Sequence, residues 1–234
     1  MLLGYAWQQK CGKTATGQPT RVNDKNRNQS ATVRRAHAAR TLRIIGGRHR
    51  GRRLRFPPLE SIRPTPDRVR ETLFNWLQGH LDGSRCLDLF AGSGVLGLEA
   101  LSRGAARVCL VESDRQAAKA IGAVLTEWQE SSGTVVQRDA IEFLREPSAS
   151  PWGGPFDVVF LDPPFAAGLL GRSAEWLERA DWLAPMAWIY LENRAREPLP
   201  ALPLNWRPLK SGRAGEVEYH LWVRHAAALG VSGG

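Results

Sequence analysis

The stretch C-L-D-L-F-A-G-S-G-V-L-G-L-E-A-L, residues 86–101, passes from an apolar run into a glycine-rich segment and then into a helix-like pattern. The run Cys86–Phe90 is typical of a buried strand, and Gly92, Gly94 and Gly97 follow it at G-x-G-x-x-G spacing. Such glycines let the backbone turn sharply and approach a nucleotide-like ligand closely where the next helix begins. The stretch therefore predicts the strand–loop–helix unit that opens a ligand-binding α/β domain.

The alternation of strand-like and helix-like segments continues along the chain. We expect further strands at Val108–Glu112, Thr134–Gln137, Val158–Leu161, Trp188–Leu191 and Tyr219–Val223, and helices near 95–103, 115–130, 140–146 and 168–180. This alternation is typical of a parallel sheet with helices on both faces. Residues 205–224 have the pattern of a hairpin. The sequence therefore predicts a Rossmann-like, doubly wound, mostly parallel seven-stranded sheet whose last strand is antiparallel.

Two further elements are expected before this sheet. Residues 42–57, L-R-I-I-G-G-R-H-R-G-R-R-L-R-F-P, predict a β-hairpin with a cationic tip, because apolar residues flank a centre rich in glycine and arginine. The segment 63–77 predicts a helix with Thr65 as its N-cap and Pro66 at its first position. We therefore divide the chain into a disordered basic leader (1–40), the hairpin and helix (41–80), a ligand-binding domain (81–225) and a mobile tail (226–234).

The formal charge of +9 is concentrated at the N-terminal end of the chain. Residues 1–70 hold 17 basic and 3 acidic side chains, whereas the remainder holds 15 basic and 20 acidic ones. A basic arm on a mildly acidic body is typical of a nucleic-acid-binding protein, although a solvated basic tail has the same composition. The three cysteines have no metal-ligand spacing. We expect free thiols, no metal, no membrane span and a cytoplasmic protein.

Acidic residues accompany the glycine loop, and two ligand classes fit them. Asp88 precedes Gly92 by four residues, and Glu112 ends the second predicted strand twenty residues after Gly92. An NAD-dependent oxidoreductase has such a pattern, and glycines can also serve a tight turn alone. However, D-x-F-x-G-x-G resembles the first motif of class I S-adenosylmethionine methyltransferases. The resemblance implies that S-adenosylmethionine is held by Asp88, Phe90, Gly92, Gly94, Glu112, Asp139 and Ala140, with Glu112 at the ribose hydroxyls. Asp139 equally fits the N-cap of the helix that follows it.

Residues 160–165, F-L-D-P-P-F, end the fourth predicted strand at the edge where ligands of open α/β sheets bind. D-P-P-F resembles the [DN]-P-P-[YFW] motif of methyltransferases that modify exocyclic or amide nitrogens. The Asp162 carboxylate and the Pro163 carbonyl can accept both hydrogens of a weakly nucleophilic amine, and Phe165 can stack on an extruded base. We therefore predict that Asp162, Pro163 and Phe165 are catalytic, although a strand end with a turn would also permit D-P-P.

D-P-P-F alone leaves adenine N6, cytosine N4, guanine N2 and protein glutamine open as methyl acceptors. The runs R-I-I-G-G-R-H-R-G-R-R-L, R-P-T-P-D-R-V-R-E-T-L-F-N-W-L and C-L-D-L-F-A-G-S-G-V-L-G-L-E-A-L-S-R-G-A together resemble the bacterial 16S rRNA guanine-N2 methyltransferases that act on guanine 966. The resemblance covers roughly residues 42–223. It implies a monomer that binds 16S rRNA within an assembled or nearly assembled small ribosomal subunit. The predicted RNA-binding residues are Arg48, Arg50, Arg52, Arg53, Arg63 and Arg68.

Two other functions stay open from the sequence. A DNA adenine-N6 methyltransferase would use the same D-P-P-F chemistry, but such enzymes usually have a sizeable target-recognition segment where this chain has only residues 41–80. A non-catalytic rRNA-binding assembly factor would not need Asp162 or Phe165. His49 is expected at the surface rather than in a catalytic role, because methyl transfer from a sulfonium needs no strong base.

Overall fold

The computed structural model describes residues 40–56, 65–147, 151–152, 154–165 and 168–226. Within them, seven strands form one sheet in the order β5-β4-β3-β6-β7-β9-β8. The strands are β3 (Arg85–Asp88), β4 (Arg107–Glu112), β5 (Gly133–Gln137), β6 (Phe156–Leu161), β7 (Leu183–Arg194), β8 (Trp206–Ala214) and β9 (Val217–His225). In this described sheet β9 alone runs antiparallel to the rest. The predicted fold class is confirmed.

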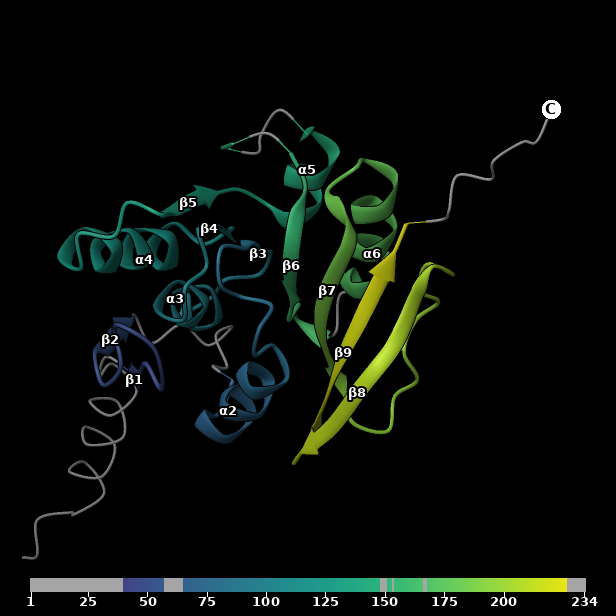
Figure 1. Ribbon diagram of the computed structural model, residues 1–234, viewed down its shortest axis with the longest axis horizontal. Coiled ribbons are helices and arrows are strands. Elements are labelled where there is room, and N and C mark those ends of the chain that lie inside the picture. Colours follow the sequence, from purple (N-terminus) through teal and green to yellow (C-terminus); the bar gives the residue numbers. More distant parts are fainter. Residues whose placement is uncertain (1–39, 57–64, 148–150, 153, 166–167, 227–234) are drawn as a thin grey trace, which may run out of the picture. The chain divides into compact units, whose positions relative to one another are not determined.

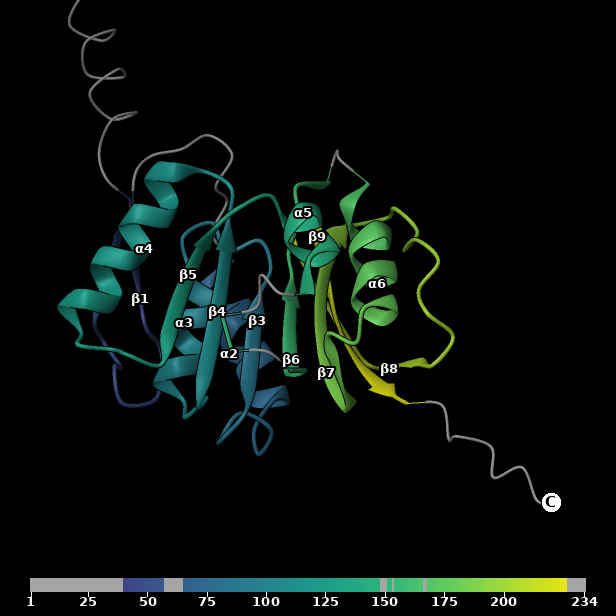
Figure 2. The same cartoon turned by 90° about the horizontal axis from the view of Figure 1, so that it is seen from above.

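Helices cover both faces of the sheet (Figures 1 and 2). The helices are α2 (Asp67–Trp76), α3 (Val95–Ser102), α4 (Arg115–Glu127), α5 (Ala140–Arg145) and α6 (Leu169–Arg179). One apolar cluster joins α2, α3 and α4 to one face, and a second joins α5 and α6 to the other. Because both faces are covered, the central strands are apolar along most of their length, as parallel sheets require.

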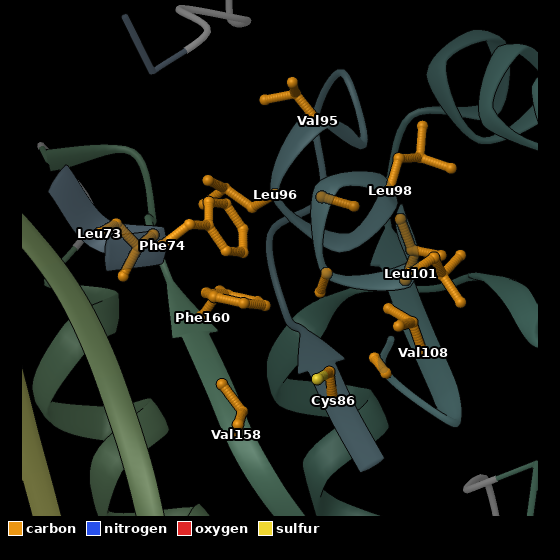
Figure 3. Close-up of a cluster of buried hydrophobic side chains, with 14 of the residues drawn as sticks. Leu73, Phe74, Cys86, Val95, Leu96, Leu98, Leu101, Val108, Val158 and Phe160 are labelled. Atoms are coloured by element: carbon orange, nitrogen blue, oxygen red, sulfur yellow. The ribbon is translucent and has the colours of Figure 1, made fainter. Parts of the chain in front are cut away.

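The core beneath α2 and α3 is packed around Phe160 of β6 (Figure 3). Phe160 is fully buried and lies 6.0 Å from Phe74 of α2, measured between ring centroids. The Cys86 and Cys109 thiols are buried and free, as predicted. Burial raises the pKa of each of these thiols to about 12, so neither is a reactive thiolate at neutral pH. Cys11 lies outside the described residues.

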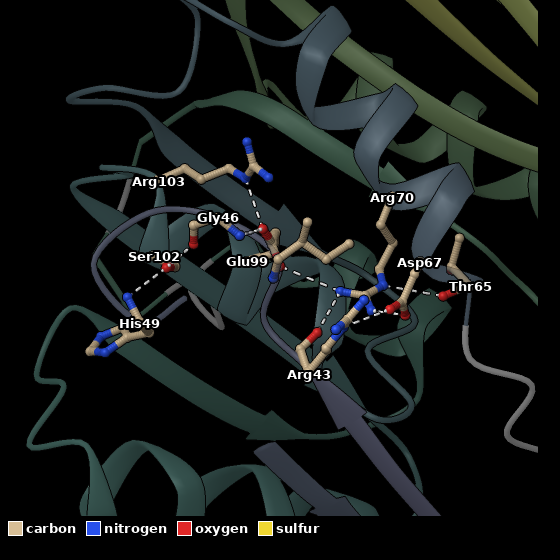
Figure 4. Close-up of polar contacts among 10 residues, drawn as sticks. Arg43, Gly46, His49, Thr65, Asp67, Arg70, Glu99, Ser102 and Arg103 are labelled. Atoms are coloured by element: carbon tan, nitrogen blue, oxygen red, sulfur yellow. Dashed lines mark hydrogen bonds and ion pairs between the residues drawn. The ribbon is translucent and has the colours of Figure 1, made fainter. Parts of the chain in front are cut away.

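The predicted hairpin is present as β1 (Arg40–Arg43) and β2 (Arg53–Phe56), which pair antiparallel with Leu42 opposite Leu54. It is held to α3 by Glu99, whose carboxylate is fully buried (Figure 4). That carboxylate accepts the N–H groups of Ile45 and Gly46, each at 2.8 Å. It also pairs with the guanidinium groups of Arg103 at 2.8 Å and Arg70 at 3.4 Å. One buried acid thus joins the hairpin and α2 to the helix that follows the glycine loop.

One local prediction was wrong, and one predicted strand is confirmed but is longer than expected. α2 begins at Asp67 after Pro66, without a side-chain N-cap, and the Thr65 hydroxyl instead donates to the Glu192 carboxylate at 3.3 Å. The strand predicted at Trp188–Leu191 runs from Leu183 to Arg194, because its two ends pair with β6 and β9 over a longer stretch than the apolar run indicates. The predicted leader and tail lie outside the described residues except at their inner ends. Among the described helices, none is long and apolar enough to cross a membrane.

Candidate active site

The carboxyl ends of four neighbouring strands, β5, β4, β3 and β6, meet at a cleft of about 320 Å³. Its lining includes most residues that were predicted from sequence to bind the cofactor or act in catalysis: Asp88, Phe90, Gly92, Glu112, Asp139, Ala140, Asp162, Pro163 and Phe165. The sequence therefore identified side chains that the fold brings together from four separate segments. This edge of the sheet is where open α/β folds bind ligands.

The glycine loop joins β3 to α3, and its glycines have different structural roles. Gly92 lines the cleft with φ 53°, and Gly94 also has a positive φ, at 75°. A Cβ on Gly94 would lie 2.9 Å from Ile121 of α4, and one on Gly97 would lie 2.7 Å from Leu110 of β4. Among the described residues Gly94 is not part of the cleft lining. Gly94 shapes the loop and, because it has no side chain, lets α4 pack closely against it. Direct cofactor contact by Gly94 stays a prediction.

Asp88 lies at the end of β3 beneath the glycine loop and is 3% exposed. Its Oδ2 accepts the N–H of Gly97 at 2.9 Å, so the carboxylate fixes the first turn of α3. Burial raises the pKa of Asp88 to about 7, the Gly97 hydrogen bond offsets part of that rise, and the nearby charge of Glu112 adds to it. A carboxyl group with this pKa is half-ionised near neutrality, which is typical of ligand-binding sites.

Glu112 and Asp139 occupy the ends of β4 and β5. The Glu112 carboxylate accepts the N–H groups of Gly92 and Asp114, both at 2.7 Å, and is thereby fixed at the cleft wall. Oε1 also accepts the Ser113 hydroxyl at 3.4 Å, whereas Oε2 has a second lone pair that can accept a ligand hydroxyl. Asp139 Oδ1 accepts the N–H groups of Ile141 at 2.8 Å and Glu142 at 3.0 Å, which confirms its role as the N-cap of α5. Its Oδ2 has no hydrogen bond to any described residue.

The D-P-P-F segment directly follows β6. Burial raises the pKa of Asp162 well above its ordinary value, and the charges of Glu192 and Asp88 raise it further. The Phe165 side chain is 36% exposed. Pro163, Pro164 and Phe165 line both the main cleft and a second cavity of about 210 Å³. The motif therefore forms the wall between two adjoining hollows.

Thr65 lines the main cleft and Glu192 lines the second cavity, and neither was predicted as a functional residue. Leu161 of β6 pairs with Leu191 of β7. The next residues along the two neighbouring strands, Asp162 and Glu192, therefore lie side by side. Glu192 is 4% exposed, and its Oε1 accepts the hydroxyls of Tyr190 at 2.6 Å and Thr65 at 3.3 Å. The acid that follows the apolar run ending in Y-L was a sequence signal for this residue, but recognising it requires knowing that β7 lies beside β6.

The predicted RNA-binding arginines have different environments. Arg50, Arg53 and Arg68 are exposed, and none of them has an ion pair with a described residue. Arg48 pairs with Glu130, and the Arg52 guanidinium lies 5.5 Å from the Trp128 ring centroid. Arg63 lies outside the described residues.

The surface position predicted for His49 was wrong. His49 is only 8% exposed, because its ring stacks on Trp128 with 4.7 Å between centroids. Its Nε2 also lies 3.2 Å from the Glu130 carboxylate. These partners lie at the end of α4 and just after it, so the tip of the hairpin is packed against the domain and is not a free loop.

The strand order, the glycine loop after β3 and the strand-end acids define a class I methyltransferase, a class that uses S-adenosylmethionine as methyl donor. The chain belongs to the family described as "Conserved hypothetical protein 95", whose model matches residues 42–223. It is 45% identical over 185 residues to the Escherichia coli K12 protein named "Ribosomal RNA small subunit methyltransferase D", an alignment that covers 79% of this chain and 91% of that one.

Solved structures agree with this assignment. The structure described as "Putative methyltransferase yhhF from Escherichia coli" superposes with a TM-score of 0.73 at 45% identity, over 80% of this chain and 100% of that one. An RNA methyltransferase from Salinibacter ruber, solved in complex with S-adenosyl-L-homocysteine, shares the fold with a TM-score of 0.53 at 17% identity, over 72% of this chain and 97% of that one.

Proposed function

We propose that the chain transfers a methyl group from S-adenosylmethionine to the exocyclic N2 of a guanine in 16S rRNA. The observation that carries the proposal is the D-P-P-F segment, which separates two adjoining cavities: Asp162 lines the main cleft, and Phe165 lines both cavities. The 45% identical relative named as a small-subunit rRNA methyltransferase supports rRNA as the substrate. The proposal includes an assembled or nearly assembled small subunit as substrate, and a monomeric cytoplasmic enzyme.

The residues of the main cleft fit the cofactor. Glu112 would accept the two ribose hydroxyls, because its carboxylate is already fixed by backbone N–H groups. Oε2 keeps a free lone pair for one hydroxyl, and at Oε1 the other would replace the long contact from the Ser113 hydroxyl. Asp139 and Ala140, at the start of α5, would lie at the adenine end. Asp88, with Phe90 and the glycine loop, would lie at the cationic methionine end, where a positive charge offsets the cost of ionising a buried acid.

The methyl-transfer step needs an oriented nitrogen and an acceptor for one proton. When bound, S-adenosylmethionine supplies an electrophilic methyl carbon, to which the guanine N2 bonds while the carbon–sulfur bond breaks and sulfur keeps the electron pair. Asp162 and the Pro163 carbonyl accept the two N2 hydrogens and hold the nitrogen lone pair toward that carbon. Asp162 then takes up the proton that N2 releases, and its raised pKa makes it a better acceptor. Phe165 stacks on the extruded base.

The N-terminal hairpin would supply phosphate contacts. Arg50, Arg53 and Arg68 are exposed and suited to positioning the RNA without reading its sequence. Arg48 and Arg52 have protein partners in the described part of the chain and would help to fix the shape of the hairpin as well as its charge. Arg63 is proposed to contact RNA by resemblance alone.

The test is transfer of labelled methyl groups to small subunits that lack the modification, followed by mass analysis of the nucleosides. We expect N2-methylguanosine at a single site. Asp162→Ala should lower the rate by at least about 100-fold while S-adenosylhomocysteine binding persists. N6-methyladenosine, or equal methylation of duplex DNA, would refute the guanine assignment in favour of the adenine enzyme. Absence of transfer to any substrate would favour an assembly factor, and equal transfer to free 16S rRNA would refute the need for a particle.

A further inference from the structure

The second cavity adjoins the main cleft across the D-P-P-F wall. Its lining comes from that wall, from the start of α6, from the end of β7 and from the segment that follows β7. Drug-sized ligands occupy pockets of roughly 300 Å³ or more. At about 210 Å³ this cavity is sized for a smaller ligand, such as one planar base. The partly exposed Phe165 ring in its wall is suited to stacking on that base.

One buried carboxylate, Glu192, lines this cavity. Its Oε1 accepts two hydroxyls, from Tyr190 and Thr65, which orient the side chain. Its Oε2 has no hydrogen bond to any described residue. Because Oε2 is accessible from the cavity, a ligand that offers an N–H at this position would form a charge-assisted hydrogen bond there. The carboxylate is therefore both oriented and able to accept one more hydrogen bond.

The candidate bases differ in whether the ring nitrogen next to the reacting amine is a hydrogen-bond donor or an acceptor. Guanine carries the N1–H donor next to its N2 amine. In adenine and cytosine, the ring nitrogen next to the exocyclic amine is an acceptor without a hydrogen. A pair of adjacent carboxylates can therefore bind guanine through N1–H and N2–H, but would face a lone pair in either of the other bases. Enzymes that extrude a base read its Watson–Crick edge in this way.

We propose that Glu192 selects guanine as the methyl acceptor, its Oε2 accepting N1–H while Asp162 accepts N2–H. The inference rests on the proposed function and names the residue that sets its base specificity. The register of β6 and β7, which places Leu161 opposite Leu191, brings the two acids into line at the same edge of the sheet. The charge of Glu192 also raises the pKa of Asp162, which agrees with their closeness.

The orientation of Glu192 makes a specificity switch testable. In Glu192→Gln, the amide oxygen is expected at the Oε1 position, where it accepts the hydroxyls of Tyr190 and Thr65. The NH₂ group then occupies the Oε2 position and presents a donor to the cavity. This variant should bind a base whose N1 is an acceptor. 2-Aminopurine is such a base, because it keeps the 2-amine nucleophile but has no hydrogen on N1.

The experiment uses small subunits reconstituted with 16S rRNA that carries guanine or 2-aminopurine at the methylated position. For the wild-type chain we expect kcat/KM to be at least about 100-fold higher with guanine, since sites built for a hydrogen-bond donor strongly reject analogues that lack it. Glu192→Gln should lower this preference by at least about 100-fold and bind S-adenosylhomocysteine normally. Glu197→Gln is the matched control, because Glu197 lines the same cavity but is an exposed acid paired with Arg194.

Each outcome decides the inference separately from the proposed function. A folded Glu192→Gln protein that binds the cofactor and keeps the wild-type preference would overturn the role of Glu192, while N2-methylguanosine made by the wild type would still support the function. If Glu192→Gln does not fold, the wild-type comparison alone decides: equal rates on guanine and 2-aminopurine would overturn the inference, and a preference of at least about 100-fold would support it. A wild-type product other than N2-methylguanosine would overturn both.

Discussion

Replacing Asp88 by asparagine should stabilise the protein at alkaline pH and weaken its cofactor binding at the same time. Burial raises the pKa of Asp88 from 3.8 to about 7. A carboxyl group with a raised folded-state pKa contributes stability below its unfolded pKa, and that contribution is lost as the pH rises through 7. Since one pKa unit corresponds to about 1.4 kcal/mol, ionised Asp88 costs the folded state roughly 4 kcal/mol at pH 8.

Asparagine has no charge to desolvate, and its side-chain oxygen can still accept the Gly97 N–H. The free energy of unfolding of Asp88→Asn relative to wild type should therefore rise by roughly 2–3 kcal/mol between pH 5 and pH 8. Urea unfolding of the full chain at both pH values measures this difference. Asp157→Asn is a suitable control, because the Asp157 carboxylate also accepts a backbone N–H, from Arg85 at 2.8 Å, at a more exposed position.

The functional half of the prediction uses the same variant. Loss of a negative charge beside the cationic end of the cofactor should weaken S-adenosylmethionine binding about tenfold at pH 8, as measured by calorimetry. A stability difference that stays constant from pH 5 to pH 8 would refute the argument from burial. A variant that gains the predicted stability but binds the cofactor like wild type would show that Asp88 has no part in cofactor binding.

Three further substitutions test the loop, the buried acid of α3 and the ribose site. Gly97→Ala should cost about 1–3 kcal/mol in urea unfolding, because its Cβ would lie 2.7 Å from Leu110. Glu99→Gln should cost about 3 kcal/mol, since it removes the negative charge beside the buried Arg70, and faster proteolysis of the hairpin should accompany it. Glu112→Gln should weaken S-adenosylhomocysteine binding about tenfold and leave binding of its 2′,3′-dideoxy analogue unchanged.

The parts of the fold that were predicted correctly are those whose signal is local. The apolar run of β6 and the glycines after β3 lie in single short stretches, so composition and spacing alone indicate strand, loop and helix. Asp162 and Glu112 were found in the same way, because each is the first acid after an apolar run. The residues predicted for the main cleft thus depended on recognising strand ends, not on knowing the strand order.

The parts that were missed depend on contacts between distant segments. Thr65 has the composition of an N-cap, but its hydroxyl bonds to Glu192, 127 residues further along the chain. His49 lies in a basic segment that is typical of a surface, yet Trp128 covers its ring. The position of Glu192 beside Asp162 depends on the pairing of β7 with β6, which no local pattern specifies. Sequence periodicity predicts helices and strands, whereas contacts between distant residues depend on how those elements are arranged in the fold.

The strand order also explains why the site is strongly acidic. β3, β6 and β7 are neighbours, and the acids near their carboxyl ends are Asp88, Asp162 and Glu192. Burial raises the pKa of each of them, and the charges of Glu192 and Asp88 raise the pKa of Asp162 further. At neutral pH, the free-energy cost of ionising these buried acids opposes folding unless a ligand offsets that cost. A sulfonium cation on one side of the D-P-P-F wall and adjacent N–H donors on the other would supply this compensation. The acids would then favour the two reactants together over either one alone, because each reactant lowers the cost of keeping the shared carboxylates ionised.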